Sequence, residues 1–280
     1  MNELNHRCMR RVGRGGLAAG ACAIAASTLL ACSDDAPKPL TTPETRDVIA
    51  RTVDDLLNRD AKNFQRERQR IAARQTAEFV EENMPTVKAF RSAFQLLSHS
   101  VDQVPAEIAD GLWAEFGVYS GKTINHIASE TEHEVHGFDS FEGLPEDWRT
   151  KFPKGTFKMD GMPVVRENVK LHKGWFDKSV PEWAGKYPGH MAFIHFDADL
   201  YSSTKTVLDV LADRIVPGTV LQFDEFFNYP GWKGGEYRAF MEFVEARGVS
   251  FEYIGYVEAG YAEQVAVRIT KVEPPLPAAR

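Results

Sequence analysis

Acidic side chains follow a short apolar run in the second half of the chain. The run 191–196 leads directly into Asp197 and Asp199. Alternate residues of an extended chain lie on the same side, so these two carboxylates can reach a common metal ion or substrate. The same acids could instead cap the helix start that Ser202 and Ser203 predict. The spacing alone leaves both interpretations open.

His195 lies in the same run and shares the side of the two aspartates. A histidine inside a strand is more often a hydrogen-bonded core residue than a ligand. We therefore keep His195 as a candidate catalytic residue beside Asp197 and Asp199. Together with Lys205, it is an alternative to the aspartates for accepting a proton from a substrate.

A second pair of acids, Asp224 and Glu225, follows the apolar run 219–223. A strand that follows its predecessor through one helix usually lies beside it, so this pair should meet Asp197 at one edge of the sheet. Three carboxylates so close repel one another unless a cation lies among them, and an all-oxygen set selects magnesium or calcium over zinc. We predict a metal site of Asp197, Asp224 and Glu225, with solvated surface acids as the alternative.

A turn with two glycines, Gly117 and Gly121, follows the first apolar run after residue 105. Glycines let the backbone approach a ligand closely. The spacing departs from the dinucleotide fingerprint, because Glu115 occupies the place of its first glycine. It also departs from a P-loop, which has four residues between its glycines instead of three. The run Gly121-Lys122-Thr123 still keeps a nucleotide-binding enzyme as an alternative.

Two further acids, Glu115 and Asp139, lie near the ends of the first two predicted strands after residue 105. A carboxylate at Glu115 would repel phosphates but suits an ammonium or sulfonium group, and S-adenosylmethionine carries both. The tip of the next strand, at Asp139, is where an acid accepts the hydroxyls of a ribose, although Asp139 could also cap a turn with Ser140. We predict that S-adenosylmethionine is bound by Glu115, Gly117, Gly121, Asp139 and Ser140.

Strands and helices alternate from residue 105 onward, and they must position these side chains. This alternation predicts a mainly parallel, seven-stranded Rossmann-like α/β sheet with helices on both faces. Apolar runs without alternation fit strands that are buried on both sides. The predicted strands, of which the last two are antiparallel neighbours, are 112–117, 134–138, 169–171, 191–196, 219–223, 251–256 and 264–269. Helices are predicted at 122–129, 203–213 and 235–247.

The segment 44–104, which precedes this domain, is predicted to be helical. Its apolar residues recur at helical spacing over 44–83, Pro85 breaks the pattern, and a second amphipathic helix is predicted over 87–97. The α/β domain then extends over 105–272, and 273–280 form a tail.

The first 31 residues differ from the rest of the chain. Arginines precede an uncharged run over 17–31, which is too short to span a bilayer but typical of a signal peptide. The run 29–32 resembles a bacterial lipoprotein processing site with Cys32 as the lipidated residue. The proline-rich segment 32–43 is a predicted tether. We expect membrane anchoring through Cys32 if this leader is used, and a cytoplasmic protein if it is not.

Charge and cysteine content exclude several functions. All three cysteines lie within residues 1–32, so the predicted domain has no disulfide, thiolate nucleophile or cysteine metal site. Residues 1–31 carry four arginines and one glutamate, and without them the formal charge falls from −7 to −10. This acidity argues against nucleic acid as a partner. The chemistry must come from oxygen and nitrogen groups.

Four runs of the sequence together resemble class I S-adenosylmethionine-dependent methyltransferases of the macrocin O-methyltransferase type. The resemblance extends over residues 113–269, and its runs are 115–121, 137–145, 197–204 and 224–225. The run Phe-Asp-Ser-Phe-Glu-Gly-Leu-Pro at 138–145 is the most specific. The resemblance implies that Glu115 and Asp139 hold the cofactor and that magnesium lies beside the acceptor hydroxyl, held by Asp197, Asp224 and Glu225.

The same resemblance implies methyl transfer to a hydroxyl of a small molecule, such as a sugar or another polyol. The loop 226–235, with Tyr229 and Trp232, is the predicted acceptor pocket. Many relatives have Asp-Asp at the position of 224–225, and Leu200 occupies the place of a basic lysine in metal-dependent catechol methyltransferases, so the base stays unassigned. A second alternative is a non-catalytic, lipid-anchored binding protein that keeps the fold, because an exported enzyme would lack its cytosolic donor. The sequence leaves the oligomeric state open, a homo-oligomer included.

Overall fold

The computed structural model describes residues 43–61 and 63–273. The predicted leader, Cys32 and the tether up to residue 42 lie outside the described residues. Internal contacts divide the chain into two units, 1–57 and 58–280, and each is described by itself. Within the described ranges, no helix is both long and apolar enough to cross a membrane.

The described part of the first unit is helical, as predicted. Helix α1 (Pro43–Ala61) begins here and carries Val48, Ile49, Val53 and Leu56 at helical spacing. All four of these apolar side chains are exposed. The stripe that they form is therefore not part of a described hydrophobic core.

Helix α2 (Phe64–Asn83) lies in the second unit, and the single helix predicted over 44–83 is therefore two helices. Asn63 starts the second one, because its side-chain oxygen accepts a hydrogen bond from the backbone N–H of Arg66 at 3.2 Å. Ala72 and Thr76 are the buried residues of α2.

The helix predicted over 87–97 is wrong in its first half. Residues Ala89–Phe90 form a short strand, β1, and helix α3 spans Ala93–Asp102. Ser92 sets the start of α3, since its side chain accepts a hydrogen bond from the backbone N–H of Gln95.

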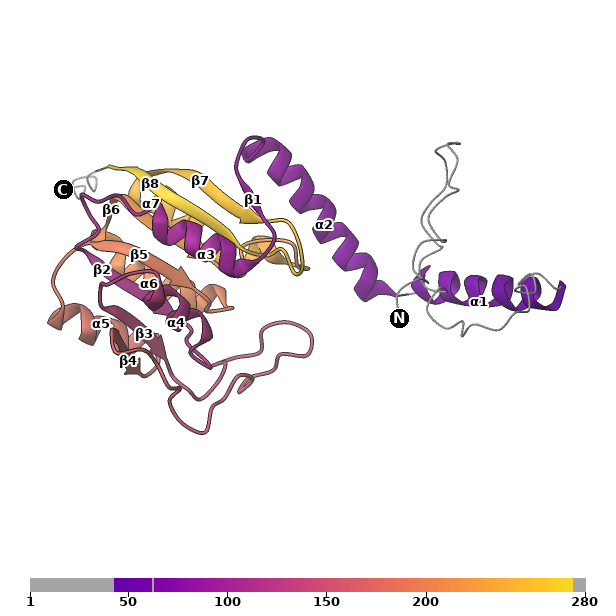
Figure 1. Ribbon diagram of the computed structural model, residues 1–280, viewed down its shortest axis with the longest axis horizontal. Coiled ribbons are helices and arrows are strands. Elements are labelled where there is room, and N and C mark those ends of the chain that lie inside the picture. The colour runs from indigo at the N-terminus through magenta and orange to yellow at the C-terminus, as the bar shows by residue number, and fades with distance from the viewer. Residues whose placement is uncertain (1–42, 62, 274–280) are drawn as a thin grey trace, which may run out of the picture. The chain divides into compact units, whose positions relative to one another are not determined.

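The α/β domain is built on one eight-stranded sheet (Figure 1) with the order β1-β7-β8-β6-β5-β2-β3-β4. All seven predicted strands are confirmed, and β1 is an additional edge strand. β8 is antiparallel to β6 and β7, while the other neighbours are parallel. The predicted strands are β2 (Leu112–Phe116), β3 (Val135–Asp139), β4 (Val169–Lys173), β5 (Met191–Phe196), β6 (Ile215–Phe223), β7 (Val249–Val257) and β8 (Val265–Val272).

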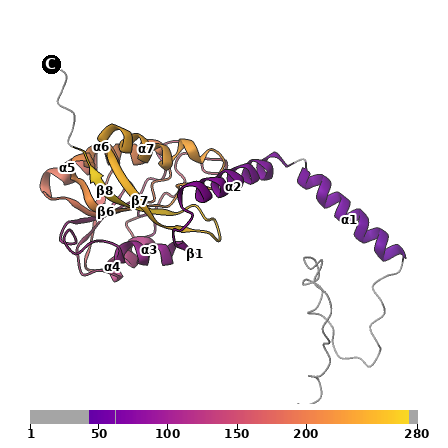
Figure 2. The same cartoon turned by 90° about the horizontal axis from the view of Figure 1, so that it is seen from above.

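Helices cover both faces of the sheet (Figure 2), which confirms the Rossmann-like fold. α3 and α4 (Lys122–Ser129) lie on one face. The other face carries α5 (Phe176–Lys186), α6 (Tyr201–Leu211) and α7 (Glu236–Arg247). Helix α5 was not predicted, because Pro181 and Gly185 interrupt its sequence pattern, yet its Val180 and Trp183 are buried.

A row of phenylalanines crosses the sheet where four parallel strands end. The register pairs Phe116 with Phe138 and Phe196, and Phe196 with Phe223. Their ring centroids lie 4.7, 5.8 and 5.0 Å apart in these three pairs. The row aligns the strand ends, so the residues that follow it emerge at one edge of the sheet.

Substitution of Gly137, a residue of β3, tests how tightly helix α4 packs on this strand. A Cβ at this position would overlap Ile124 Cδ1 and lie 2.8 Å from Val118 Cγ2. We expect Gly137→Ala to lower the free energy of unfolding by about 1–3 kcal/mol, because such overpacking forces neighbours to move. Denaturant unfolding followed by tryptophan fluorescence measures this change.

Gly185→Ala is the matched control. Gly185 lies in α5, and its added Cβ would meet no atom within 4 Å. This substitution should raise stability by up to about 1 kcal/mol, since alanine favours a helix over glycine. Equal stability of the two variants would contradict the packing assigned to Gly137.

Candidate active site

The turn after β2 touches the turn after β5. Gly117 has φ +97°, and a Cβ there would overlap the carbonyl oxygen of Asp197. Gly117 N–H donates to the Phe138 carbonyl at 2.9 Å, and Asp197 N–H donates to the Phe116 carbonyl at the same distance. Only glycine fits both the conformation and the close approach. The turn thus brings the predicted cofactor and metal residues together.

Asp139 is held in place by backbone donors. Its Oδ2 accepts from the N–H groups of Val118 and Tyr119 at 3.0 and 2.8 Å, and its Oδ1 accepts from Phe141 N–H at 2.6 Å. The carboxylate therefore shapes the glycine turn as well as facing the cavity described below. Ser140 Oγ accepts from Glu142 N–H at 3.0 Å, the turn capping that the sequence analysis gave as an alternative.

Gly121 is the residue before helix α4, with φ +78°. The next residue, Lys122, points to the face of the sheet that α3 covers, where its Nζ lies 5.1 Å from the centroid of the Phe94 ring. A P-loop lysine would instead face a phosphate at the strand ends. The arrangement therefore does not favour the nucleotide alternative.

Three carboxylates meet beyond the ends of β5 and β6. Asp197, Asp199 and Glu225 each offer an oxygen within 4.8 Å of the others, an arrangement that could hold a metal ion. Asp197 and Asp199 were expected to meet along an extended chain. Asp199 instead has φ +60°, and a tight turn with a hydrogen bond from Leu200 N–H to the Ala198 carbonyl brings it back toward Asp197.

Asp224, the other predicted ligand, lies next to this group but is engaged elsewhere. Its Oδ2 accepts a hydrogen bond from Gln264 Nε2 at 3.2 Å, and its Oδ1 lies 3.9 Å from His195 Nε2. The structure thus brings Asp199 into the three-carboxylate group in the place predicted for Asp224. Whether either acid binds a metal stays a prediction.

The electrostatics of the group favour a cation. Burial and the charge of Asp224 raise the pKa of Asp197 well above its ordinary value, and burial and Asp199 do the same for Glu225. Burial raises the pKa of Asp199 to about 7, although Arg149 opposes this. Glu225 Oε2 is buried without a hydrogen-bond partner among the described residues. A divalent cation would relieve the repulsion and satisfy this oxygen.

His195 and Glu115 form a buried pair beneath the acids. Both side chains are 0% exposed, and His195 Nδ1 lies 2.9 Å from Glu115 Oε1. Burial disfavours the imidazolium, but the carboxylates of Asp224 and Glu115 outweigh it and raise the pKa of His195 to about 10. The two acids thus favour the protonated form of His195, although burial raises the pKa of Glu115 as well. The predicted contact of Glu115 with the cofactor stays a prediction.

Glu236 is a site residue that the sequence analysis missed. It is fully buried at the start of α7; its Oε2 accepts from Glu225 N–H and its Oε1 from the Thr204 hydroxyl, both at 3.1 Å. Burial raises its pKa to about 8. An acid in the first turn of a predicted helix was the available signal, but it is common and gave no reason to expect burial.

A single cavity of about 1680 Å³ joins the cofactor and acid regions. Its lining includes Gly117, Asp139, Asp197, Asp199 and Glu225. Among the predicted acceptor residues, Tyr229 and Trp232 are buried and pack against aromatic neighbours, whereas Asn228 and Pro230 of the same loop line the cavity.

Strained backbone concentrates around this cavity. Positive φ angles, between 44° and 80°, occur at five lining residues that are not glycine: Tyr119, Lys151, Phe157, Asp199 and Asn228. Such conformations persist only where the surrounding structure enforces them, and they cluster at functional sites. The cavity is therefore the candidate active site.

Comparisons with known proteins agree with this location. Residues 114–226 match a family described as a methyltransferase domain, and this range contains the glycine turn and all three clustered acids. A 4'-O-methyltransferase of Streptomyces olivaceus, which is named for 8-demethyl-8-(2,3-dimethoxy-alpha-L-rhamnosyl)-tetracenomycin-C, is 28% identical over 156 residues. The match covers 46% of this chain and 58% of that relative's length.

Solved structures of methyltransferases are also similar in part. The calicheamicin methyltransferase CalS11 is 23% identical, with a TM-score of 0.49 over 63% of this chain and 77% of the other. The O-methyltransferase NovP is 18% identical, with the same TM-score over 64% of this chain and 79% of the other.

Removal of Glu115 tests the buried pair. Glu115→Ala should lower the free energy of unfolding by about 3 kcal/mol, because it leaves the His195 charge buried beside an empty space. Denaturant unfolding at neutral pH measures the loss. Glu252→Ala, which breaks an exposed pair with Arg268 on β7 and β8, should cost at most about 1 kcal/mol. A Glu115→Ala variant as stable as this control would refute the charged pair.

Proposed function

We propose that this chain, which carries a class I S-adenosylmethionine-dependent methyltransferase domain, transfers a methyl group from S-adenosylmethionine to a hydroxyl of a small molecule. The observation that carries the proposal is that one cavity contains both the glycine turn with Asp139 and the acids Asp197, Asp199 and Glu225. A donor held at the first two strands and an acceptor oxygen held at the acids would meet inside it.

The acceptor class that we propose is a sugar or another polyol. The Streptomyces olivaceus relative bears the name of a 4'-O-methyltransferase of a rhamnosyl compound. The cavity is large enough for a donor and an acceptor together.

Methyl transfer requires an acceptor oxygen in line with the methyl carbon and its bond to sulfur. The new bond joins oxygen to the methyl carbon, the carbon–sulfur bond breaks, and S-adenosylhomocysteine leaves with the bonding electrons. We assign the hydroxyl proton to Asp199, which lines the cavity and belongs to the three-carboxylate group. His195 is less suited, because its Nδ1 is held by Glu115 and its ring is fully buried.

Magnesium fits the acids as a cofactor. Their oxygens lie within 4.8 Å of one another, and the unpartnered Glu225 Oε2 supplies a free ligand atom. Asp197, Asp199 and Glu225 would hold the ion, with Asp224 beside them. A bound divalent cation lowers the pKa of a hydroxyl that contacts it.

Cofactor binding is the first test of the function. Calorimetric titration of the full chain should show binding of S-adenosylmethionine and none of ATP. Asp139→Ala should weaken S-adenosylmethionine binding by about 1.5–3 kcal/mol. The substitution removes both the proposed hydrogen bond from the donor to the Asp139 carboxylate and the support that this carboxylate gives to the glycine turn. Asp160→Ala, which changes an exposed acid in the loop after β3, serves as the control. Binding of ATP without S-adenosylmethionine would favour the nucleotide alternative.

Metal removal is the second test. Excess EDTA should leave S-adenosylmethionine affinity nearly unchanged but abolish turnover, because an alcohol hydroxyl stays protonated at neutral pH and the bare acids repel a developing alkoxide. Asp197→Asn keeps the shape of the side chain and should make added magnesium ineffective. Methyl transfer and calorimetric Mn²⁺ binding are the measurements.

Asp209→Asn is the control for this substitution. Asp209 is an exposed acid on α6 that pairs with Lys205, and its loss should leave metal dependence as it is in the unaltered chain. Full-rate transfer in excess EDTA would exclude the metal role. Donor binding without turnover of any hydroxyl acceptor would favour the non-catalytic alternative.

A further inference from the structure

A loop with a defined conformation forms one wall of the cavity. We name residues 144–156, within the long connection between β3 and β4, the cap loop. Its base is closed by hydrogen bonds from Leu144 N–H to the Thr156 carbonyl at 2.8 Å and from Gly155 N–H to the Leu144 carbonyl at 2.9 Å. Its tip is a turn in which Trp148 N–H donates to the Phe152 carbonyl at 3.0 Å. Most cap-loop residues line the cavity, so they form a wall with a defined conformation.

Arg149, at the tip, ties the cap loop to a distant part of the chain. Its two terminal nitrogens donate to the two carboxylate oxygens of Glu263 at 3.1 and 3.0 Å. Glu263 lies between β7 and β8 and is only 6% exposed. The guanidinium carbon also lies 3.8 Å from the ring centroid of Trp148 and 4.7 Å from that of Tyr229. A bidentate pair whose guanidinium also contacts two aromatic rings has a fixed orientation.

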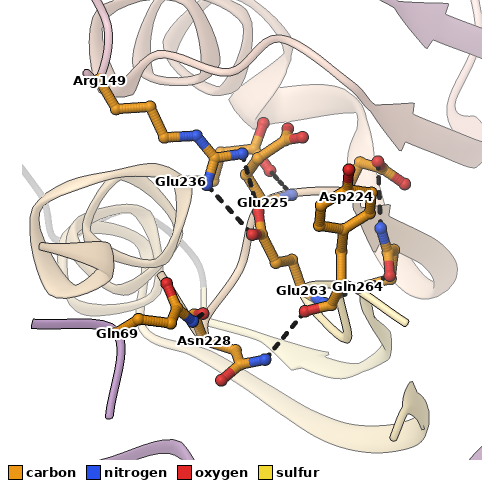
Figure 3. A network of polar contacts seen from close by, with 9 residues as sticks. Gln69, Arg149, Asp224, Glu225, Asn228, Glu236, Glu263 and Gln264 are labelled. Carbon is orange, nitrogen blue, oxygen red and sulfur yellow. Dashed lines mark hydrogen bonds and ion pairs between the residues drawn. The ribbon is translucent and has the colours of Figure 1, made fainter. Parts of the chain in front are cut away.

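The Glu263 side of this tie connects to the acid group. The Glu263 carbonyl accepts from the N–H groups of Phe226 and Phe227 at 2.9 and 3.3 Å, directly after Glu225. The next residue, Gln264, donates to Asp224 at 3.2 Å. Figure 3 shows the Arg149–Glu263 and Gln264–Asp224 contacts, which join separate segments of the chain. A shift of the cap loop is therefore linked to the acid end of the cavity.

Helix α2 joins the same network. Gln69 Nε2 donates to the Asn228 carbonyl at 2.6 Å, and Asn228 Nδ2 donates to the Tyr261 carbonyl at 2.8 Å, two residues before Glu263. Asn228 N–H also donates to the Thr76 hydroxyl at 2.9 Å. Side-chain contacts thus hold these walls of the cavity, and Arg149–Glu263 links the cap loop to them. A second side-chain bond, from Ser202 Oγ to Glu146 Oε1 at 2.7 Å, ties the cap loop to α6 on another side.

We propose that Arg149 and Glu263 are positioning residues for the acceptor: their ion pair holds the cap loop as the wall against which a sugar ring binds, with its hydroxyl toward Asp199. This rests on the function proposed above and deepens it. The proposed donor residues are Gly117, directly after β2, and Asp139, the last residue of β3, and neither contacts Arg149 or Glu263 in the bonds described above. Loss of the pair should therefore impair acceptor binding and spare donor binding.

A purely structural ion pair predicts a different outcome. Removal of either partner would then destabilise the domain as a whole, without a selective effect on the cap loop or on the acceptor. Arg149→Lys separates the two roles, because lysine keeps the charge but cannot form the bidentate pair or stack in the same way. Glu263→Gln keeps the shape and removes the charge.

Hydrogen–deuterium exchange on the full chain provides the test. With S-adenosylhomocysteine bound, the amides of Leu144, Trp148, Phe152 and Gly155 should be protected in the unaltered protein. In Arg149→Lys and Glu263→Gln they should exchange about tenfold faster, while amides of the sheet and the affinity for S-adenosylhomocysteine stay the same. The reversed pair Arg149→Glu with Glu263→Arg should restore protection relative to each single reversal.

The acceptor role is tested in the same experiment with methyl glycosides of rhamnose, glucose, galactose and mannose as probes. At least one should protect the cap loop further in the unaltered protein, with an affinity that falls about tenfold in both variants. Arg268→Lys and Glu252→Gln, which alter the exposed pair on β7 and β8, are controls and should change neither quantity.

Three results would overturn the inference. They are unchanged cap-loop exchange in both variants, faster exchange spread over the whole domain, or no protection of the cap loop by any of the four glycosides. Failure of the unaltered chain to bind S-adenosylmethionine would instead refute the proposed methyl transfer. In that case, hydrogen–deuterium exchange of the unliganded protein would still test whether the ion pair holds the cap loop.

Discussion

Mutual repulsion of buried carboxylates dominates this site. Asp197, Asp199 and Glu225 each offer an oxygen within 4.8 Å of the others, and the side chains of Asp199 and Glu225 are buried. Such charges are stable only near cations. The chain supplies two: His195 faces Asp224 from the core, and Arg149, in the cap loop, opposes the rise that burial causes in the pKa of Asp199. Neither side chain forms a hydrogen bond to Glu225 Oε2, which leaves a position suited to a metal ion.

The sheet creates this concentration of charge through its register. Because these neighbouring strands are parallel, the carboxyl ends of β2, β3, β5 and β6 lie at one edge of the sheet. The row of phenylalanines aligns these strand ends with one another. After each of these strands the backbone turns within one or two residues, so the turns lie close together. Gly117 permits this by letting the first turn contact the backbone of Asp197. Asp199 has a positive φ angle within the tight turn that places its carboxylate beside that of Asp197.

The sequence predicts what depends on local pattern and misses what depends on tertiary contact. The strands were identifiable because full burial makes them continuous apolar runs, and their order along the chain implied which tips would meet. Helix α5 was missed because Pro181 and Gly185 contradict it locally, while the burial of Trp183 that stabilises it is tertiary. The Arg149–Glu263 pair joins residues more than a hundred positions apart, and no spacing rule relates them.

The make-up of the acid group follows from side-chain length and from neighbours. Glutamate at position 225 has one more methylene than the aspartate expected there, so its carboxylate extends farther from the strand end. Its backbone is fixed by Glu236, which leaves only the side chain free to adjust. Asp224 is drawn toward His195 and Gln264, on the core side. The two effects together place Glu225 with Asp197 and Asp199, whereas the motif alone groups Asp197 with Asp224 and Glu225. Asp199 is thereby both a member of the three-carboxylate group and a lining residue of the cavity, so under the proposed function one of its oxygens faces the cation and the other is available to the acceptor.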